Sequence, residues 1–534
     1  MAVNTDTVDV QVSEGLVRGR REGPGMSVAA FRGVPYAAPP LAERRFAVPL
    51  PPLGRREILR ADGPVGTAPL QLPSAVGTLM NDPKPAETES CLTVNVWSPS
   101  LRQGPRPVLV WLPGGSFLTG GADLARYDGA ELAAQEQIVV VLVNYRLGAL
   151  GFLAPEWAEP ARIEGSGTEL TFRTPSEAGW TTNAGLLDQI AALRWIKKEI
   201  GAFGGDPDQI AVAGQSAGGQ SLAALLALPQ VRPLFRRALL HSAPLGMAPM
   251  PRAEAAETAE IFRKALGAEG AEDLRQATLG QLRRAQQHVL TRPRPAGDVR
   301  PPFRLVEDGP VVAPDTAQAL RASPELAGTE IMLGTTRHEC ALWFARQSAP
   351  VSNAGRDGVT AEFARAFGSR ADEALETYAA AVSPPYNALS TAFEEFKTDA
   401  FFAAPTHAFA DILHRHGART RMFRFDWQVP GRYSALRACH CVDIPFLLGR
   451  EEARHAPLFA DADQGGMQRL RHSVRRMWGA FVRTGSPSPT WAEHTPERPV
   501  VRAVGGEFAG TTLGSLVEPE RRALWPASAL ISPQ

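Results

Sequence analysis

The amino-acid sequence predicts an α/β protein whose central sheet is mostly parallel and is covered by helices on both faces. Two observations predict this fold class. Short apolar runs rich in valine and isoleucine occur at intervals, and segments with helical spacing of apolar residues lie between them. Strands that are apolar on both faces and separated by helices are typical of a parallel sheet buried between helical layers.

Each element follows from its pattern. A continuous apolar run of strand length predicts a buried strand, and apolar residues three and four positions apart predict a helix. In chain order, these patterns predict strands at Val108–Leu112 and Ile138–Val143, a helix at Leu186–Ile200, a strand at Ile210–Ala213, a helix at Ser221–Leu228, and strands at Ala238–Leu240 and Glu330–Leu333.

A later helix carries Met467, Val474 and Phe481 on one face, and Gly485 is placed to end it. Two segments, about 251–300 and 352–395, are predicted as helical excursions from the sheet that cap it and shape a pocket. We expect one domain over residues 1–534, because the chemical motifs described below extend along nearly the whole chain.

Composition and charge exclude several classes of protein. The chain has 534 residues, of which 44% are hydrophobic, and 56 basic residues balance 56 acidic ones. A formal net charge of zero gives no reason to expect binding to nucleic acid or to an anionic membrane surface. The N-terminus lacks the basic start and apolar run of a secretory signal, and the most apolar stretch, Ile138–Leu150, is too short for a membrane span. We therefore expect a cytoplasmic protein whose oligomeric state is open.

Four cysteines in a chain of this length do not form a disulfide framework. Cys439 and Cys441 flank His440, which could suggest a metal site. However, ligands at positions i and i+2 lack the gap that lets two thiolates wrap a zinc ion. We expect free thiols, no metal and no organic cofactor.

The segment Ala211–Gly219 contains the pattern G-x-S-x-G around Ser216, after a predicted strand and before a predicted helix. A serine nucleophile on such a turn needs small neighbours two positions away on each side, and Gly214 and Gly218 meet this need. The start of the following helix directs its positive end towards an anion formed at the serine. Alone the pattern is common, but its place between strand and helix favours a catalytic serine.

Several longer segments resemble the signatures of the carboxylesterase type B family of α/β hydrolases, which includes cholinesterases and bacterial para-nitrobenzyl esterases. They occur in the family's order and cover nearly the whole chain. They are Phe31–Pro40, Glu89–Pro99, Asn144–Leu153, Asn183–Ile196, Phe203–Gly219, Thr398–Pro405 and Phe481–Pro489. The resemblance implies the α/β-hydrolase fold and hydrolysis of carboxylic esters by an acyl-enzyme route.

The resemblance also assigns the partners of Ser216. The segment Cys439–Phe446 is similar to the family's histidine loop and implies His440 as the base. Gly334–Cys340 follows a predicted strand and is similar to the acid loop, which implies Glu339 rather than the adjacent His338. Asp443 is a weaker candidate acid, because it is too close to His440 in sequence to reach the far ring nitrogen.

By the same resemblance, Leu112–Phe117 is the oxyanion loop, with backbone donors at Gly115, Ser116 and Ala217. The loop departs from the family pattern, because Pro113 replaces a histidine and Ser116 replaces a glycine. Ser242 is similar to a buried serine that supports the acid, although a plain core hydroxyl is an equal alternative.

Gln215 stands where cholinesterases carry glutamate, so the site has no carboxylate to attract a cationic alcohol. This position resembles bacterial aryl-ester and phenylcarbamate hydrolases such as phenmedipham hydrolase. The sequence thus predicts an esterase for neutral aryl and alkyl esters, with carbamates as slow substrates. A lipase for long acyl chains and a catalytically silent binding protein are the alternatives.

The segment Pro160–Thr182 is longer than the family usually has at this place. It is rich in polar residues and glycine, which predicts a loop. A mobile loop beside the pocket and an inert surface insertion are both open.

Overall fold

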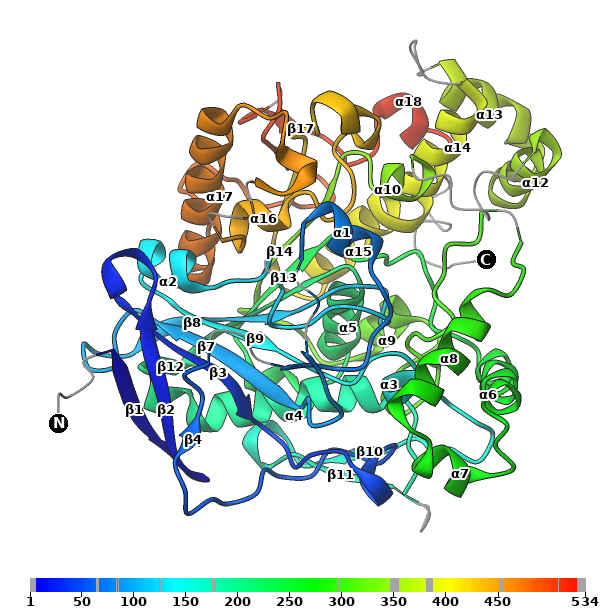
Figure 1. Cartoon of the computed structure of the whole chain (residues 1–534). Helices are drawn as coiled ribbons and strands as arrows, with labels where there is room; N and C mark the ends of the chain where they lie inside the picture. Colours follow the sequence, from blue (N-terminus) through cyan, green and yellow to red (C-terminus); the bar gives the residue numbers. More distant parts are fainter. Residues whose placement is uncertain are drawn as a thin grey trace.

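The computed structural model describes residues 6–525 apart from 64–66, 83, 85, 125, 175–178, 296, 346–354, 381–387, 451–452, 454 and 508. Strands from the whole of this part of the chain form one large mixed sheet (Figure 1). In spatial order its strands are β1 (Thr7–Val12), β2 (Gly15–Glu22), β3 (Val28–Pro35), β7 (Thr93–Ser98), β9 (Val139–Val143), β8 (Arg106–Leu112), β12 (Gly205–Gln215), β13 (Arg237–His241), β14 (Glu330–Thr336), β15 (Arg419–Phe425), β16 (Val501–Val504) and β17 (Thr512–Leu513), with β4 (Leu59–Arg60) beside β2.

The strands from β9 to β16 all run parallel, whereas β1, β2, β3 and β7 form an antiparallel edge and β17 closes the other edge. The predicted mostly parallel sheet is confirmed. So are the predicted strands, each of which lies within or overlaps an observed one.

Side chains alternate between two hydrophobic layers along the central strands. On β8, Val108, Val110 and Leu112 belong to one layer, while Leu109 and Trp111 belong to the other. The first layer packs on α4 (Ala184–Glu199), α5 (Ala217–Leu226) and α15 (Ala404–Arg415), and the second packs on α16 (Ile444–Leu447) and α17 (Gln464–Thr484). Burial on both faces explains why these strands are apolar throughout.

The remaining helices lie around this core. They are α1 (Ala75–Leu79), α2 (Ala130–Glu136), α3 (Gly148–Phe152), α6 (Arg252–Leu266), α7 (Ala271–Gln276), α8 (Leu279–Leu290), α9 (Thr316–Ala322), α10 (Ala341–Phe344), α12 (Arg356–Phe367), α13 (Ala371–Ala380), α14 (Ala388–Thr398) and α18 (Pro519–Arg522). The two predicted excursions correspond to α6–α8 and α12–α14, although positions 296, 352–354 and 381–387 lie outside the described residues.

The segment 160–182 differs from its prediction. It forms a short antiparallel hairpin, β10 (Arg162–Glu164) and β11 (Thr171–Arg173), and Leu170 is fully buried against the core. Figure 1 shows this hairpin beyond α4, on the opposite side of the molecule from α10 and α16. Positions 175–178 lie outside the described residues.

Two smaller features complete the fold. β5 (Thr67–Ala68) and β6 (Ala86–Glu87) form a separate short pair, and all four cysteines are unpaired. In the described part of the chain, no helix combines the length and the apolar character needed to cross a bilayer.

Candidate active site

Ser216 occupies a sharp turn between β12 and α5, as the sequence predicts. Its backbone has φ 55° and ψ −122°, a strained conformation for a residue with a side chain. A Cβ on Gly214 would lie 2.2 Å from the carbonyl oxygen of Gly218, and a Cβ on Gly218 would lie 2.0 Å from that of Leu112. Only glycine fits at both positions, which explains the spacing of the motif.

The structure brings the predicted acid and base together. Glu339 lies on the loop that follows β14, and its Oε2 is 2.5 Å from Nδ1 of His440. The other carboxylate oxygen accepts a hydrogen bond from the N–H of Thr336 at 2.8 Å. Two backbone bonds join the acid and histidine loops: His338 N–H donates to Ala438, and His440 N–H donates to Glu339. Both side chains are almost completely buried, which fixes the imidazole orientation.

The far nitrogen of His440 contacts Gln215. The amide Nε2 of Gln215 lies 3.1 Å from Nε2 of His440 and donates to Sγ of Cys441, also at 3.1 Å. Among the described residues, no hydrogen bond joins the hydroxyl of Ser216 to His440. The amide therefore occupies the place beside Nε2 of His440 that the hydroxyl of Ser216 would need in order to transfer its proton.

The surroundings of His440 raise its pKa. Burial alone would lower it, because a desolvated imidazolium is unfavourable, but the neighbouring Cys441 and the Glu339 carboxylate outweigh burial and raise the pKa well above its ordinary value. His440 consequently becomes a neutral base only at a pH above the usual range for histidine.

The predicted oxyanion loop lies against the nucleophile turn. A Cβ on Gly114 would be 2.9 Å from Cβ of Ser216 and 2.5 Å from Oε1 of Gln215. Gly115 has φ 128°, and Ser116, with φ 57°, takes a left-handed conformation that usually favours glycine. The N–H groups of Gly115, Ser116 and Ala217 donate no hydrogen bond to any described residue. These donors are free to bind an anion beside Ser216.

Two aromatic residues beside His440 were not identified from the sequence. The rings of Trp343 and Phe402 each lie 5.2 Å from the imidazole, measured between centroids. Trp343 belongs to α10, which follows the acid loop, and Phe402 lies in a π-helical turn, Asp399–Ala403. Such turns often occur at functional sites. The sequence held two signals of these aromatic residues. Trp343 is close to Glu339 in sequence, and the segment Thr398–Pro405 contains a pair of aromatic residues.

Three other residues that were considered from the sequence, Ser242, Asp443 and His338, do not contact the side chains of Glu339 or His440 through hydrogen bonds. The hydroxyl of Ser242 is buried without a hydrogen-bond partner among the described residues, so it does not support Glu339; the N–H of Thr336 takes that place. Asp443 contacts His241 rather than His440. His338 faces Glu395 at 3.9 Å, and burial lowers its pKa to about 3, so it remains neutral.

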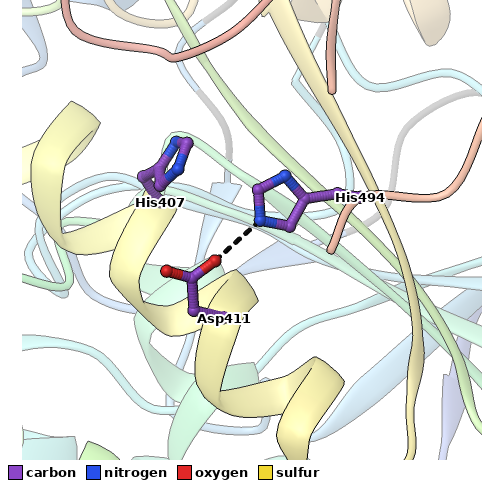
Figure 2. Close-up of side chains that lie close together, drawn as sticks. All are labelled: His407, Asp411 and His494. Carbon is purple, nitrogen blue, oxygen red and sulfur yellow. Dashed lines mark hydrogen bonds and ion pairs between the residues drawn. The ribbon is translucent and has the colours of Figure 1, made fainter. Parts of the chain in front are cut away.

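Another group of described residues has the composition of a metal site (Figure 2). Single ligand atoms of His407, Asp411 and His494 all lie within 4.8 Å of one another. However, the N–H of Val500 donates to Nδ1 of His494, so Nε2 carries the proton and donates to Asp411 at 2.8 Å. A metal-binding histidine instead donates from its second nitrogen. Arg522 also lies close enough to disfavour a cation at His407. The cluster fits a buried hydrogen-bonded pair better than a metal centre.

Comparison with known proteins agrees with this geometry. A model of the Carboxylesterase family matches residues 6–160 and 170–509. The chain belongs to this family. It is 34% identical over 487 residues to phenmedipham hydrolase of Pseudarthrobacter oxydans, and the aligned region covers 90% of this chain and 92% of the relative. It is 32% identical over 507 residues to para-nitrobenzyl esterase of Bacillus subtilis, where the aligned region covers 91% of this chain and 93% of the relative.

Solved structures extend the likeness to the whole fold. A para-nitrobenzyl esterase structure superimposes with a TM-score of 0.80 at 30% identity, covering 97% of this chain and 99% of the other. The protein therefore has the α/β-hydrolase fold and is a carboxylic ester hydrolase that acts on small ester substrates. The predicted fold class, family and activity are confirmed.

Proposed function

We propose that Ser216, His440 and Glu339 form the catalytic triad of a serine esterase for neutral aryl and alkyl esters. The observation that carries this proposal is the 2.5 Å contact between Glu339 and His440 beside a serine held in a strained turn. In this arrangement Nδ1 of His440 keeps its proton, and Nε2, which contacts the amide of Gln215, is the nitrogen that accepts one.

The mechanism has two similar steps. When the amide of Gln215 gives way, His440 takes the proton of Ser216 as the hydroxyl attacks the ester carbonyl. The N–H groups of Gly115, Ser116 and Ala217 hold the tetrahedral oxyanion, and His440 then returns the proton to the leaving alcohol. Water repeats this path on the acyl-enzyme.

The preference for neutral substrates rests on the residues around His440. The residue before Ser216 is the neutral amide of Gln215, and the rings of the half-buried Trp343 and the buried Phe402 lie beside His440. Aromatic surface favours aryl groups. The names of two relatives, a phenmedipham hydrolase and a para-nitrobenzyl esterase, support the same substrate class. We include aryl carbamates as slow substrates, because their carbonyl carbon is less electrophilic.

Two further features complete the proposal. The chain acts as one catalytic unit, since the proposed triad joins residues that are spread from Ser216 to His440 along the sequence. It works in the cytoplasm, which the four unpaired cysteines support because thiols persist in a reducing compartment.

The decisive experiment compares wild type with Ser216→Ala. The variant should lose at least about 10⁴-fold in kcat for phenyl acetate while keeping its circular dichroism spectrum, because the covalent step is lost. An organophosphate such as diethyl 4-nitrophenyl phosphate should label Ser216 in wild type only, as read by peptide mass spectrometry. Activity within about tenfold of wild type would refute the assignment.

A substrate panel tests the specificity. We expect kcat/KM for phenyl acetate to exceed that for acetylcholine, and nitrophenyl esters of increasing acyl length separate an esterase from a lipase. A preference for the choline ester, or for the longest acyl chains, would contradict the proposed class.

A further inference from the structure

A second buried histidine, His241, lies beside all three segments that carry the proposed triad. It is the last residue of β13 and is 2% exposed. Its carbonyl oxygen accepts the N–H of Ser216 at 2.9 Å, and the next N–H, from Ser242, donates to Gly334 on β14 at 2.8 Å. The backbone at His241 thus joins the nucleophile turn to the strand that leads to Glu339.

The hydrogen bonds of its side chain define its tautomer. The indole N–H of Trp478, on α17, donates to Nε2 of His241 at 2.8 Å. Because an indole nitrogen can only donate, Nε2 carries no proton and Nδ1 does. Nδ1 lies 3.0 Å from Oδ2 of Asp443, so a neutral His241 donates to this carboxylate. The rings of Trp111, Phe423 and Trp478 surround the imidazole and prevent it from turning.

Asp443 belongs to the loop of the proposed base, three residues after His440. It stands at the N-cap position of α16, where aspartate usually caps the helix, yet its side chain makes no capping bond. Instead it reaches His241, and its second oxygen is buried without a partner among the described residues. A buried carboxylate that is only partly satisfied destabilises a fold. Helix capping therefore does not explain this carboxylate, whereas the bond to His241 does.

We propose that His241 and Asp443 form a positioning pair that holds the His440 loop in register with Ser216. The proposal rests on the function proposed above. The backbone of His241 fixes Ser216, and its side chain fixes the loop of His440, so a single residue sets the separation between nucleophile and base. Displacement of reacting groups by about 1 Å can cost about 100-fold in rate. The pair should therefore control kcat and leave substrate binding unchanged.

The test removes the donor with His241→Leu, which still fills the apolar surroundings. We expect kcat for phenyl acetate to fall by about 10- to 100-fold, with KM changed by less than about threefold. The concentration of active sites is measured by titration to completion with diethyl 4-nitrophenyl phosphate. Rates are expressed per active site, so that a loss of folded protein does not lower the measured kcat. His241→Asn keeps an N–H near the position of Nδ1 and should recover most of the loss.

The chain offers a matched control in the pair of His494 and Asp411 (Figure 2). His494 is fully buried and bonds its carboxylate at 2.8 Å, but no hydrogen bond joins it to the triad among the described residues. His494→Leu should lower the melting temperature while keeping kcat per site within about twofold. Equal losses of kcat in the two leucine variants would overturn the proposal, and so would His241→Asn no better than His241→Leu.

A second comparison applies if His241→Leu does not fold. At position 443, Asp443→Asn keeps an oxygen that accepts from Nδ1, whereas Asp443→Leu does not. The asparagine variant should have the higher kcat per site, and equal values would overturn the proposal. Failure of the triad itself would be seen separately, as activity retained by Ser216→Ala.

Discussion

The contact between Gln215 and His440 makes a quantitative prediction for the variant Gln215→Glu. The substitution preserves the shape of the side chain but places a carboxylate where the amide now lies 3.1 Å from Nε2 of His440. A negative charge there stabilises the imidazolium form. It should raise the pKa of His440 further and move the acidic limb of kcat/KM to higher pH.

The size of this shift follows from the distance. Two unit charges 3.1 Å apart interact by about 1.3 kcal/mol in water and by about 5 kcal/mol at an effective dielectric constant of about 20. Because about 1.4 kcal/mol corresponds to one pKa unit, the lower bound is a rise of about one unit. His440 is only 4% exposed, so the shift should exceed this bound.

The assay is a pH-stat measurement of phenyl acetate hydrolysis. In wild type the limb should lie above pH 6.5, because the pKa of His440 is raised from that value. In Gln215→Glu it should move up by at least about one pH unit, while the plateau at high pH is largely kept. Gln215→Met, which adds no charge, is the control and should not move the limb upwards. A limb that stays in place or moves down in Gln215→Glu would refute the electrostatic reasoning.

Three further predictions follow from the site and its support. Glu339→Gln should keep the fold but lower kcat by at least about 100-fold, because the imidazole loses its orienting carboxylate. Stopped-flow measurement of acylation tests the rate and circular dichroism tests the fold; a normal kcat would mean that another residue is the acid. Gly214→Ala places a Cβ 2.2 Å from the carbonyl of Gly218 and should destabilise the protein by about 1–3 kcal/mol in urea unfolding, with unchanged stability as the contrary result. Replacing Arg162–Arg173 by a short linker should lower the melting temperature, because Leu170 is lost from the core. It should leave KM unchanged across the ester panel, because the hairpin lies away from α10 and α16. An altered substrate range would mean that the hairpin influences the pocket.

The central strands could be predicted from sequence because both of their faces are buried. A run such as Val139–Val143 is apolar at every position, and no solvent-facing residue interrupts it. β15 was not predicted for the opposite reason. Arg421 and Arg424 lie inside this strand and are buried beside Glu493 and Asp426, so the sequence resembles an exposed segment. The partner of Arg421 lies 72 positions away, and Arg424 also bonds Glu518, 94 positions away, so these pairings cannot be read from the local sequence.

The proposed triad could be assigned from the sequence because its motifs are local, but the contacts that surround it could not. The bond from Gln215 to His440 and the bond from His241 to Asp443 each join residues more than 200 positions apart. The tautomer of His241 depends further on Trp478. The π-helical turn that directs Phe402 towards His440 has no periodic signature, because a single turn with wider spacing interrupts an otherwise regular helical pattern.

The long separations within the site also bear on how the enzyme becomes active during folding. The bond between His440 and Glu339 spans 101 residues, and the one between Gln215 and His440 spans 225. Contacts between such distant segments form late, because the chain must first lose the entropy of closing large loops. On a ribosome, the turn of Ser216, the proposed nucleophile, emerges long before His440, its proposed base, has been synthesised. Recovery of esterase activity after dilution from denaturant should therefore lag behind recovery of helical circular dichroism.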